Sequence, residues 1–139
     1  MQIEIKLMAQ PIRPRGDLPK DLIGSIGALV EFSGIVRGEE DGQQIAALAY
    51  EAYPAMAHQV MKDIIEDIGR RHPCFWVQVT HRLGNVPVGE AAIHIMVAAR
   101  HRAEAFAMLH EFMDRLKQDA PIWKRPAPTA AEGAHPRQP

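Results

Sequence analysis

AAIHIMVAARHRAEAFAMLHEFMDRLKQ, residues 91–118, changes its apolar period once, and this change decides the fold. Residues 91–99 form a largely apolar run, which predicts a strand. From about Arg100 to Gln118 the apolar residues recur at helical spacing, which predicts a helix with one apolar face: Ala105, Met108, Leu109, Phe112, Met113 and Leu116. Pro121 ends this helix, because proline cannot continue it. A strand followed at once by an amphipathic helix predicts a sheet with a helix packed on it.

A second helix is expected to begin at Pro54, where the N–H that proline lacks would have no partner within the first helical turn. Pro73 stops this helix. Its apolar residues fall at helical spacing as well: Met56, Val60, Ile64, Ile65 and Ile68.

Further strands are expected where apolar residues alternate or are β-branched, at 3–7, 27–38, 45–53 and 75–84. The polar residues 38–44 predict a hairpin connection, and residues 85–90 predict a turn. Residues 11–19 are interpreted as a connection and 21–27 as a short helix broken by glycines. Gly34 indicates a bulge or a close backbone approach. This order of elements predicts an α+β fold, with antiparallel sheet strands and helices packed on one side.

Length and composition indicate a single globular domain. The chain has 139 residues, of which 47% are hydrophobic and 24% charged, and this balance excludes a disordered chain. We expect residues 1–125 to form the domain. Residues 126–139 are rich in proline and alanine, and we expect them to form a flexible tail.

Charge and cysteine content narrow the classes of function. The net charge is −1, so neither nucleic acid nor a membrane is expected as a partner, and any anion site must be local. Cys74 is the only cysteine, which excludes an intrachain disulfide and a multi-cysteine metal site. Met1 leads directly into a strand pattern without a signal peptide, and no apolar run reaches the roughly 18–20 residues that span a bilayer. We therefore expect a cytoplasmic protein.

The segment RLKQDAPIWKR (115–125) concentrates four cations beside a proline and a tryptophan. Lys117 lies in the last predicted helical turn, where a cation also stabilises the helix dipole. Lys124 and Arg125 follow outside the helix, and we expect Trp123 to anchor that loop against the core. The two lysine amines can then converge, and neighbouring ammonium groups favour each other's neutral form, which a nucleophile or general base requires. The alternative is a helix end with solvated basic residues.

Cations also occur at two other structural transitions. His101 and Arg102 begin the last helix, where unpaired N–H groups and the dipole favour negative charge. An anion held there is one interpretation, and an exposed basic pair is the other. Arg37 by itself is interpreted as a hairpin-end arginine paired with Glu39 or Glu40. The other histidines lack metal-ligand spacing, so no metal site is expected.

Five segments, taken together, resemble the large, catalytic subunit of molybdopterin synthase. They occur in the family's order and cover about residues 27–125. The combination is specific because each segment carries its own motif: GALVEFSGIVRG (27–38), LAYEAYPAMA (48–57), VTHRLGNVPVGE (79–90), VAARHRAEAFAML (97–109) and MDRLKQDAPIWKR (113–125).

The resemblance implies a sulfurtransferase of molybdenum cofactor biosynthesis with an α/β hammerhead fold. Such an enzyme converts cyclic pyranopterin monophosphate into molybdopterin by adding two sulfurs as a dithiolene. The resemblance implies that the sulfur arrives as a C-terminal Gly-Gly thiocarboxylate on a ubiquitin-like small subunit, whose tail inserts into the large subunit. It also implies a homodimer of large subunits within a heterotetramer, and a step that requires no metal or organic cofactor.

Matched position by position, the family's two catalytic lysines fall on Lys117 and Lys124. Lys117 is expected to transfer a proton or to accept an acyl group transiently, and Lys124 to position the thiocarboxylate and stabilise negative charge. Both are also expected to bind substrate, together with six further residues: Ile35, Val36, Arg37, His101, Arg102 and Arg125. Within this set the arginines and the histidine would hold the cyclic phosphate and the pterin, because arginine offers a rigid fork of donors.

Two departures from the family pattern leave alternatives open. Pro126 stands where the family commonly has an acidic residue, so a carboxylate there is absent or supplied elsewhere. The tail is short, and Arg137 is the residue in it that would replace a further basic residue of the family. The alternative function is a non-catalytic module that binds a ubiquitin-like tail. A third possibility is a dimerising scaffold with a basic patch.

Overall fold

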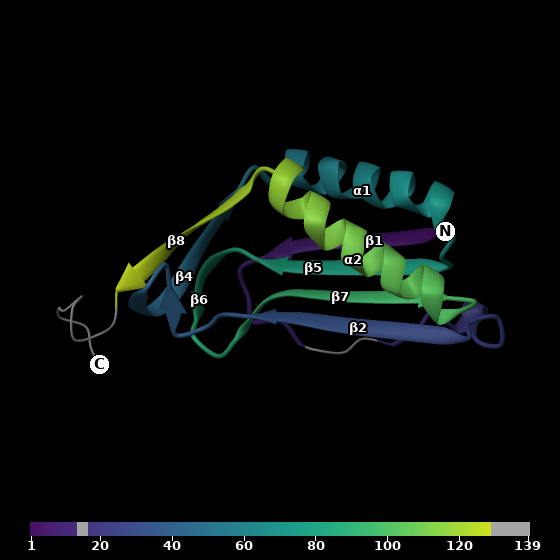
Figure 1. The fold of residues 1–139 in the computed structure, drawn as a ribbon, viewed down its shortest axis with the longest axis horizontal. Coiled ribbons are helices and arrows are strands. Elements are labelled where there is room, and N and C mark those ends of the chain that lie inside the picture. Colours follow the sequence, from purple (N-terminus) through teal and green to yellow (C-terminus); the bar gives the residue numbers. More distant parts are fainter. Residues whose placement is uncertain (14–16, 129–139) are drawn as a thin grey trace.

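Two helices cover one face of a four-stranded sheet in the computed structural model, which describes residues 1–13 and 17–128 (Figure 1). The helices are α1 (Pro54–Arg71) and α2 (Arg102–Asp119). The strands run in the order β1–β5–β7–β2, with the bounds Gln2–Met8 for β1, Trp76–Arg82 for β5, Ala91–Ala99 for β7 and Ala28–Ile35 for β2. The predicted α+β fold, with helices on one side of a sheet, is confirmed.

One strand pair differs from the expectation of a wholly antiparallel sheet. β7 pairs antiparallel with both β2 and β5, but β1 pairs parallel with β5. Parallel neighbours require a long crossover connection, and here the chain passes through β2, β4 and α1 between the two strands. The sequence interval between β1 and β5 therefore permits the parallel pairing.

The core lies between the helices and the sheet. Met61 and Ile65 of α1 and Met108 and Phe112 of α2 are at most 1% exposed, and they pack against apolar residues of β5 and β7. The predicted apolar face of α2 is confirmed at its buried positions. The prediction for α1 was wrong at Met56, which is exposed on the outer side of the first turn, whereas its neighbour Ala57 is buried in the core.

A second sheet lies at one end of the first (Figure 1) and consists of short strands around the long strand β4 (Gln43–Ala52). β4 pairs with β3 (Glu39–Glu40), β6 (Gly84–Pro87) and β8 (Ile122–Pro128). The hairpin expected at 38–44 exists between β3 and β4. Asp41 and Gly42 have φ of 51° and 79°, as a type I′ turn requires. However, β4 does not return along β2 but enters this second sheet.

Besides β3, whose two residues lie in the expected hairpin connection, two longer strands of the second sheet occupy segments for which the sequence predicted no strand. β6 replaces the expected turn at its start, and β8 replaces the expected loop and the first residues of the tail. Both are held by long-range pairing with β4, which local patterns do not reveal. Two prolines at the end of β8 are compatible with an edge strand, where a missing N–H costs no ladder bond. Residues 129–139, including Arg137, lie outside the described residues.

The predicted role of Gly34 is confirmed. The pairing of β2 with β7 shifts register between Gly34 and Ile35, as at a β-bulge. A Cβ atom at Gly34 would lie 2.8 Å from Cγ2 of Ile93, so a larger residue would push the two strands apart. The expected short helix at 21–27 is a single 3-10 turn, Lys20–Leu22. Among the described residues no helix is long and apolar enough to cross a membrane.

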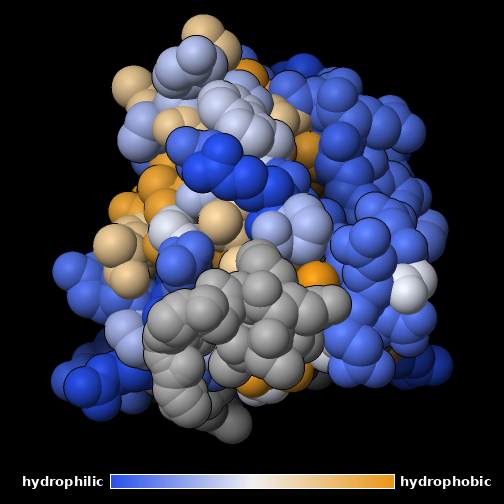
Figure 2. Space-filling model, turned by 90° about the vertical axis from the view of Figure 1, so that its left-hand side faces the viewer, coloured by the Kyte–Doolittle hydropathy of each residue, from blue (hydrophilic) through white to orange (hydrophobic). Residues whose placement is uncertain are grey.

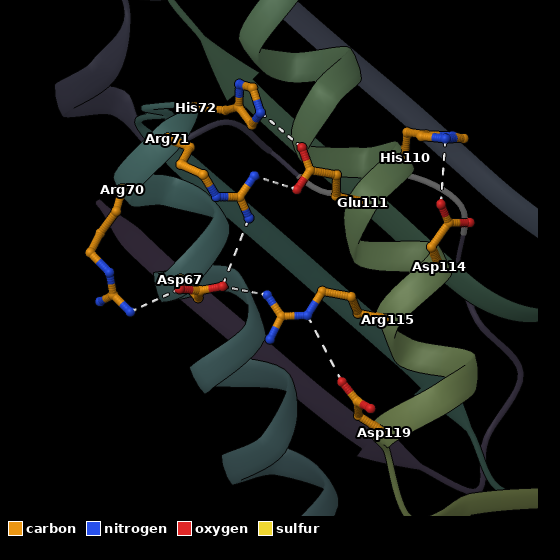
Figure 3. A network of polar contacts seen from close by, with 9 residues as sticks. All are labelled: Asp67, Arg70, Arg71, His72, His110, Glu111, Asp114, Arg115 and Asp119. Carbon is orange, nitrogen blue, oxygen red and sulfur yellow. Dashed lines mark hydrogen bonds and ion pairs between the residues drawn. The ribbon is translucent and has the colours of Figure 1, made fainter.

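Charged side chains join α1 to α2 on their outer surface (Figure 3). Asp67 of α1 contacts Arg115 of α2 and lies 3.1 Å from Arg70. Arg71 of α1 lies 2.7 Å from Glu111 of α2. The hydrogen bond from Arg115 holds the pKa of Asp67 below its usual value, and Arg71 does the same for Glu111. The network therefore favours the folded state when these carboxylates are charged.

We expect Asp67→Asn to lower the melting temperature at pH 7 by about 1–4 °C, because exposed ion pairs contribute modestly. A lowered carboxyl pKa stabilises the fold above its unfolded value, near 4, and this contribution is lost as pH falls through the folded pKa. The difference from wild type should therefore shrink in acid. Thermal unfolding between pH 3 and 7 measures it.

Asp63→Asn is the matched control, because Asp63 also lies on α1 but accepts a hydrogen bond from Gln59 of its own helix. A loss of stability at Asp67 that equals the loss at Asp63, or that does not change with pH, would contradict a role for the network between the helices.

Candidate active site

A cavity of about 510 Å³ opens where the C-terminal end of α2 meets both sheets. Its walls come from β2 and the residues after it, from β3, β4, β5, β7, the last turns of α2 and the first residues of β8. Its floor is apolar, and its polar side chains come from Arg37, Glu40, Tyr50, His81, Lys117 and Lys124. An apolar cavity with a few convergent polar groups is the usual form of a small-molecule site.

Apolar side chains also lie exposed around the cavity. Ile35 and Trp123, which both line it, are 51% and 44% exposed. Trp123 stacks edge-on against Tyr53, with ring centroids 5.4 Å apart, so it anchors β8 to the start of α1 and not to the core as we expected. Figure 2 views this end of the molecule and shows apolar patches next to strongly hydrophilic side chains. Such a mixed surface suits a partner with both apolar and charged groups.

The structure brings Lys117 and Lys124 to one cavity, as the sequence predicted. Lys117 projects from the last turn of α2. Lys124 follows the bend at Pro121, and it stands opposite Tyr50 because β8 pairs with β4. A strand holds its backbone more firmly than the loop expected from sequence. The two amines therefore enter the cavity from two separately anchored elements.

Arg37 and Glu40 complete the charged groups of the cavity. Arg37, 82% exposed, lies 3.8 Å from Glu40, which confirms one of the two partners predicted for it. Glu40 is only 15% exposed, and its carboxylate lies 2.9 Å from Nζ of Lys124. The hydrogen bond from Lys124 is the main cause that lowers the pKa of Glu40. Glu40 is thus a charged carboxylate inside a cationic cavity.

Sequence analysis missed two aromatic polar residues of the cavity, His81 and Tyr50. Their rings stack edge-on with centroids 5.0 Å apart. The Nδ1–H of His81 donates to the backbone carbonyl of Arg82 at 2.9 Å. Burial lowers the pKa of His81, so the ring is neutral at pH 7, and burial likewise raises the pKa of Tyr50. The alternation of side chains along β5 could have indicated this position for His81, because it places His81 and Arg82 on opposite faces of the strand.

Ile35, Val36 and Arg37 line the cavity as expected, but Arg125 does not. Neighbouring strand residues point to opposite faces, so Arg125 leaves the face that carries Lys124. Its guanidinium lies 3.5 Å from Glu51 on the surface. Arg125 therefore does not line the cavity with Lys124, and its expected role in substrate binding stays a prediction.

His101 and Arg102 are likewise separate from the cavity. They stand exposed at the N-terminal end of α2, whereas Lys117 is near its C-terminal end. Fifteen residues of helix rise about 22 Å, which is too far for one small ligand to contact both ends. No side chain caps this end of α2. The anion-binding pair predicted from sequence cannot join the lysines of its own chain.

Neither a cluster of metal ligands nor a thiol lies in the cavity formed by the described residues. Within residues 1–13 and 17–128, no three His, Cys, Asp or Glu side chains are grouped to hold a metal ion. Cys74 is buried beside the first turn of α2, with Sγ 3.6 Å from the backbone oxygen of Glu104. It therefore lies at the opposite end of α2 from Lys117.

Known proteins are similar to this chain in both sequence and fold. The family model for MoaE protein matches residues 9–119. A molybdopterin synthase catalytic subunit from Aspergillus niger is 36% identical over 125 residues, which span 90% of this chain and 69% of that protein. The solved molybdopterin synthase from Staphylococcus aureus superposes with a TM-score of 0.78 at 27% identity, over 89% of this chain and 90% of that one.

A solved complex of subunits 1 and 2 of the molybdopterin-converting factor from Helicobacter pylori also shares the fold. Its TM-score is 0.65 at 23% identity, over 96% of this chain and 93% of that one. Fold, cavity and relatives together define the class as the sulfurtransferases of molybdenum cofactor biosynthesis. The chain belongs to the MoaE family, the molybdopterin synthase catalytic subunits. The resemblance seen in the sequence motifs is thereby confirmed.

Cys74 should be inert in the folded protein. Burial raises the pKa of its thiol to about 11, so the reactive thiolate is scarce at neutral pH. We expect iodoacetamide to alkylate Cys74 roughly a hundredfold more slowly in the native protein than in denaturant at pH 7. Mass spectrometry of timed samples measures both rates. Rapid alkylation of the native protein would contradict this account and would make Cys74 a possible sulfur carrier.

Proposed function

We propose that this chain transfers sulfur from the C-terminal thiocarboxylate of a ubiquitin-like small subunit to cyclic pyranopterin monophosphate. The observation that carries this proposal is the cavity in which Lys117 and Lys124 stand together beside Arg37. A carboxyl-type tail and a phosphorylated substrate are both anionic, and these three cations attract such groups despite a net charge of −1. We propose the cytoplasm as the compartment, since Cys74 is a free thiol.

The residue types suit the two halves of the reaction. Lys117 is the catalytic amine, as a proton-transfer group or as a transient acyl acceptor from the small subunit. Lys124 positions the thiocarboxylate and stabilises the negative charge that develops on it. Arg37 binds phosphate through its fork of donors, and Ile35 and Val36 bring the backbone alongside the substrate. The sulfur comes from the partner, because Cys74 lies at the other end of α2.

His101 and Arg102 require a second copy of the chain if they bind the same substrate. They stand about 22 Å from Lys117 along α2. In a two-fold symmetric dimer, the N-terminal end of one α2 is free to face the cavity of the partner protomer. We therefore propose a homodimer of large subunits, with a small subunit at each end, in which the partner supplies this anion-binding pair.

Lys117→Ala should abolish sulfur transfer while the small subunit still binds. The expected loss is about a hundredfold or more, as for other groups that act in the transition state. The experiment is a single-turnover assay with thiocarboxylated small subunit and cyclic pyranopterin monophosphate, in which dithiolene product is quantified. Lys62→Ala is the matched control, because Lys62 is an exposed lysine near the middle of α1 and does not line the cavity.

The wild-type reaction separates the enzyme from the alternative, a non-catalytic module that binds a ubiquitin-like tail. If wild type binds the thiocarboxylated small subunit but yields no dithiolene, the binding module is correct and the enzyme proposal fails. If Lys117→Ala and Lys62→Ala behave alike, Lys117 has no part in the chemistry.

Mixing two inactive variants tests whether His101 and Arg102 act across a dimer. Lys117→Ala is combined with the double variant His101→Ala, Arg102→Ala under conditions that exchange protomers. Random exchange should restore about a quarter of the sites, because half of the dimers are mixed and each mixed dimer holds one intact site. No recovery after demonstrated exchange would contradict a site shared between protomers.

A further inference from the structure

The cavity contains an acidic residue that the proposed chemistry does not use. Glu40 lies on β3, the two-residue strand fixed by the Asp41-Gly42 turn. Its carboxylate is 15% exposed and lies 2.9 Å from Nζ of Lys124. A surface ion pair would need no explanation, but this pair lies in the wall of the site. The Glu40 carboxylate thus already contacts the ammonium group of Lys124, which an incoming carboxylate must reach.

We propose that Glu40 is a positioning residue, a built-in counter-ion that holds Lys124 until the anionic tail of the small subunit binds and displaces it. This inference rests on the proposed function. The Glu40 carboxylate takes the place that a bound carboxyl-type group would take beside Lys124. Its side chain can also turn toward Arg37, which already lies 3.8 Å away.

The charges around Glu40 favour the exchange of its carboxylate for that of the tail over a permanent ion pair between Glu40 and Lys124. Three cations line the cavity, Arg37, Lys117 and Lys124, and Glu40 is its only acidic lining residue within the described part of the chain. A tail carboxylate next to Lys124 would also stand next to Glu40, and two like charges at contact distance repel each other. Binding of the tail therefore requires the carboxylate of Glu40 to withdraw from Lys124.

The counter-charge of Lys124 comes from β3 and not from its own strand. Position 126 follows Lys124 by two residues on the same strand, and proline offers no charge there. The counter-charge for Lys124 comes instead from Glu40, across the sheet. The carboxylate that Pro126 does not supply is thus supplied by Glu40, from another part of the chain, which forms the ion pair with Lys124.

The counter-ion role predicts that Glu40→Gln tightens binding of the tail. Glutamine keeps the shape and an oxygen that accepts from Lys124, but it removes the competing charge. We expect the small subunit with a free C-terminal carboxylate to bind about two- to fivefold more tightly, as measured by calorimetry. Glu40→Asp keeps the charge and should stay closer to wild type. Glu39→Gln is the matched control, with the same change of net charge at an exposed neighbour outside the cavity wall.

Equal or weaker binding by Glu40→Gln, at a wild-type melting temperature, would overturn the proposal, and so would an equal effect of Glu39→Gln. If Glu40→Gln does not fold, a crystal structure of the wild-type complex decides. The tail carboxylate should then contact Lys124, with Glu40 more than about 4 Å from Nζ. A retained contact between Glu40 and Lys124 would overturn displacement.

Two further measurements separate this inference from the proposed function. Inorganic phosphate, followed by its effect on melting temperature, tests the cavity without the partner. If Glu40→Gln alters the response to phosphate but not tail binding, Lys124 serves the phosphorylated substrate, and the assignment to the tail fails. Wild-type turnover is measured on the same preparation. Absent turnover with an intact Glu40 effect would overturn the enzyme proposal alone, and normal turnover without the effect would overturn the counter-ion alone.

Discussion

The pairing of β8 with β4 is the constraint on which the site depends. After α2 ends, the chain bends at Ala120 and Pro121 and runs antiparallel to β4 from Ile122 to Pro128. This pairing returns Lys124 to the end of the helix that carries Lys117. The stacking of Trp123 on Tyr53 also holds this segment against the start of α1. Without β8, Lys117 would be an ordinary cation at a helix C-terminus.

The first sheet and its helices were predictable because their signals are local. Apolar residues at helical spacing along 102–119 face the sheet, and the apolar runs in β5 and β7 are buried. The second sheet was not predictable in this way. β6 has only four residues, β8 contains two prolines, and both are paired with β4, which comes from a distant part of the chain. The parallel pairing of β1 with β5 is a long-range feature of the same kind.

Only part of the site could be predicted from the sequence, and there is a physical reason why some residues were placed correctly and others were not. Motif resemblance identified Lys117, Lys124 and Arg37, which the fold brings to one cavity. It also grouped Arg125 with them, although strand alternation turns that side chain to another face. His101 and Arg102 were assigned correctly to a helix start, but the length of α2 separates them from the lysines. Glu40 was considered only as a partner of Arg37, since nothing in the sequence shows that it reaches Lys124.

Zero-length cross-linking tests most directly whether the tail of the small subunit enters this cavity. Carbodiimide activation of its C-terminal carboxylate forms an amide bond with whichever lysine amine lies in contact. The chain has five lysines, and only Lys117 and Lys124 line the cavity. Peptide mapping of the wild-type complex should find the tail joined to one of these two. A bond to Lys6, Lys20 or Lys62 instead would place the tail elsewhere and contradict the account.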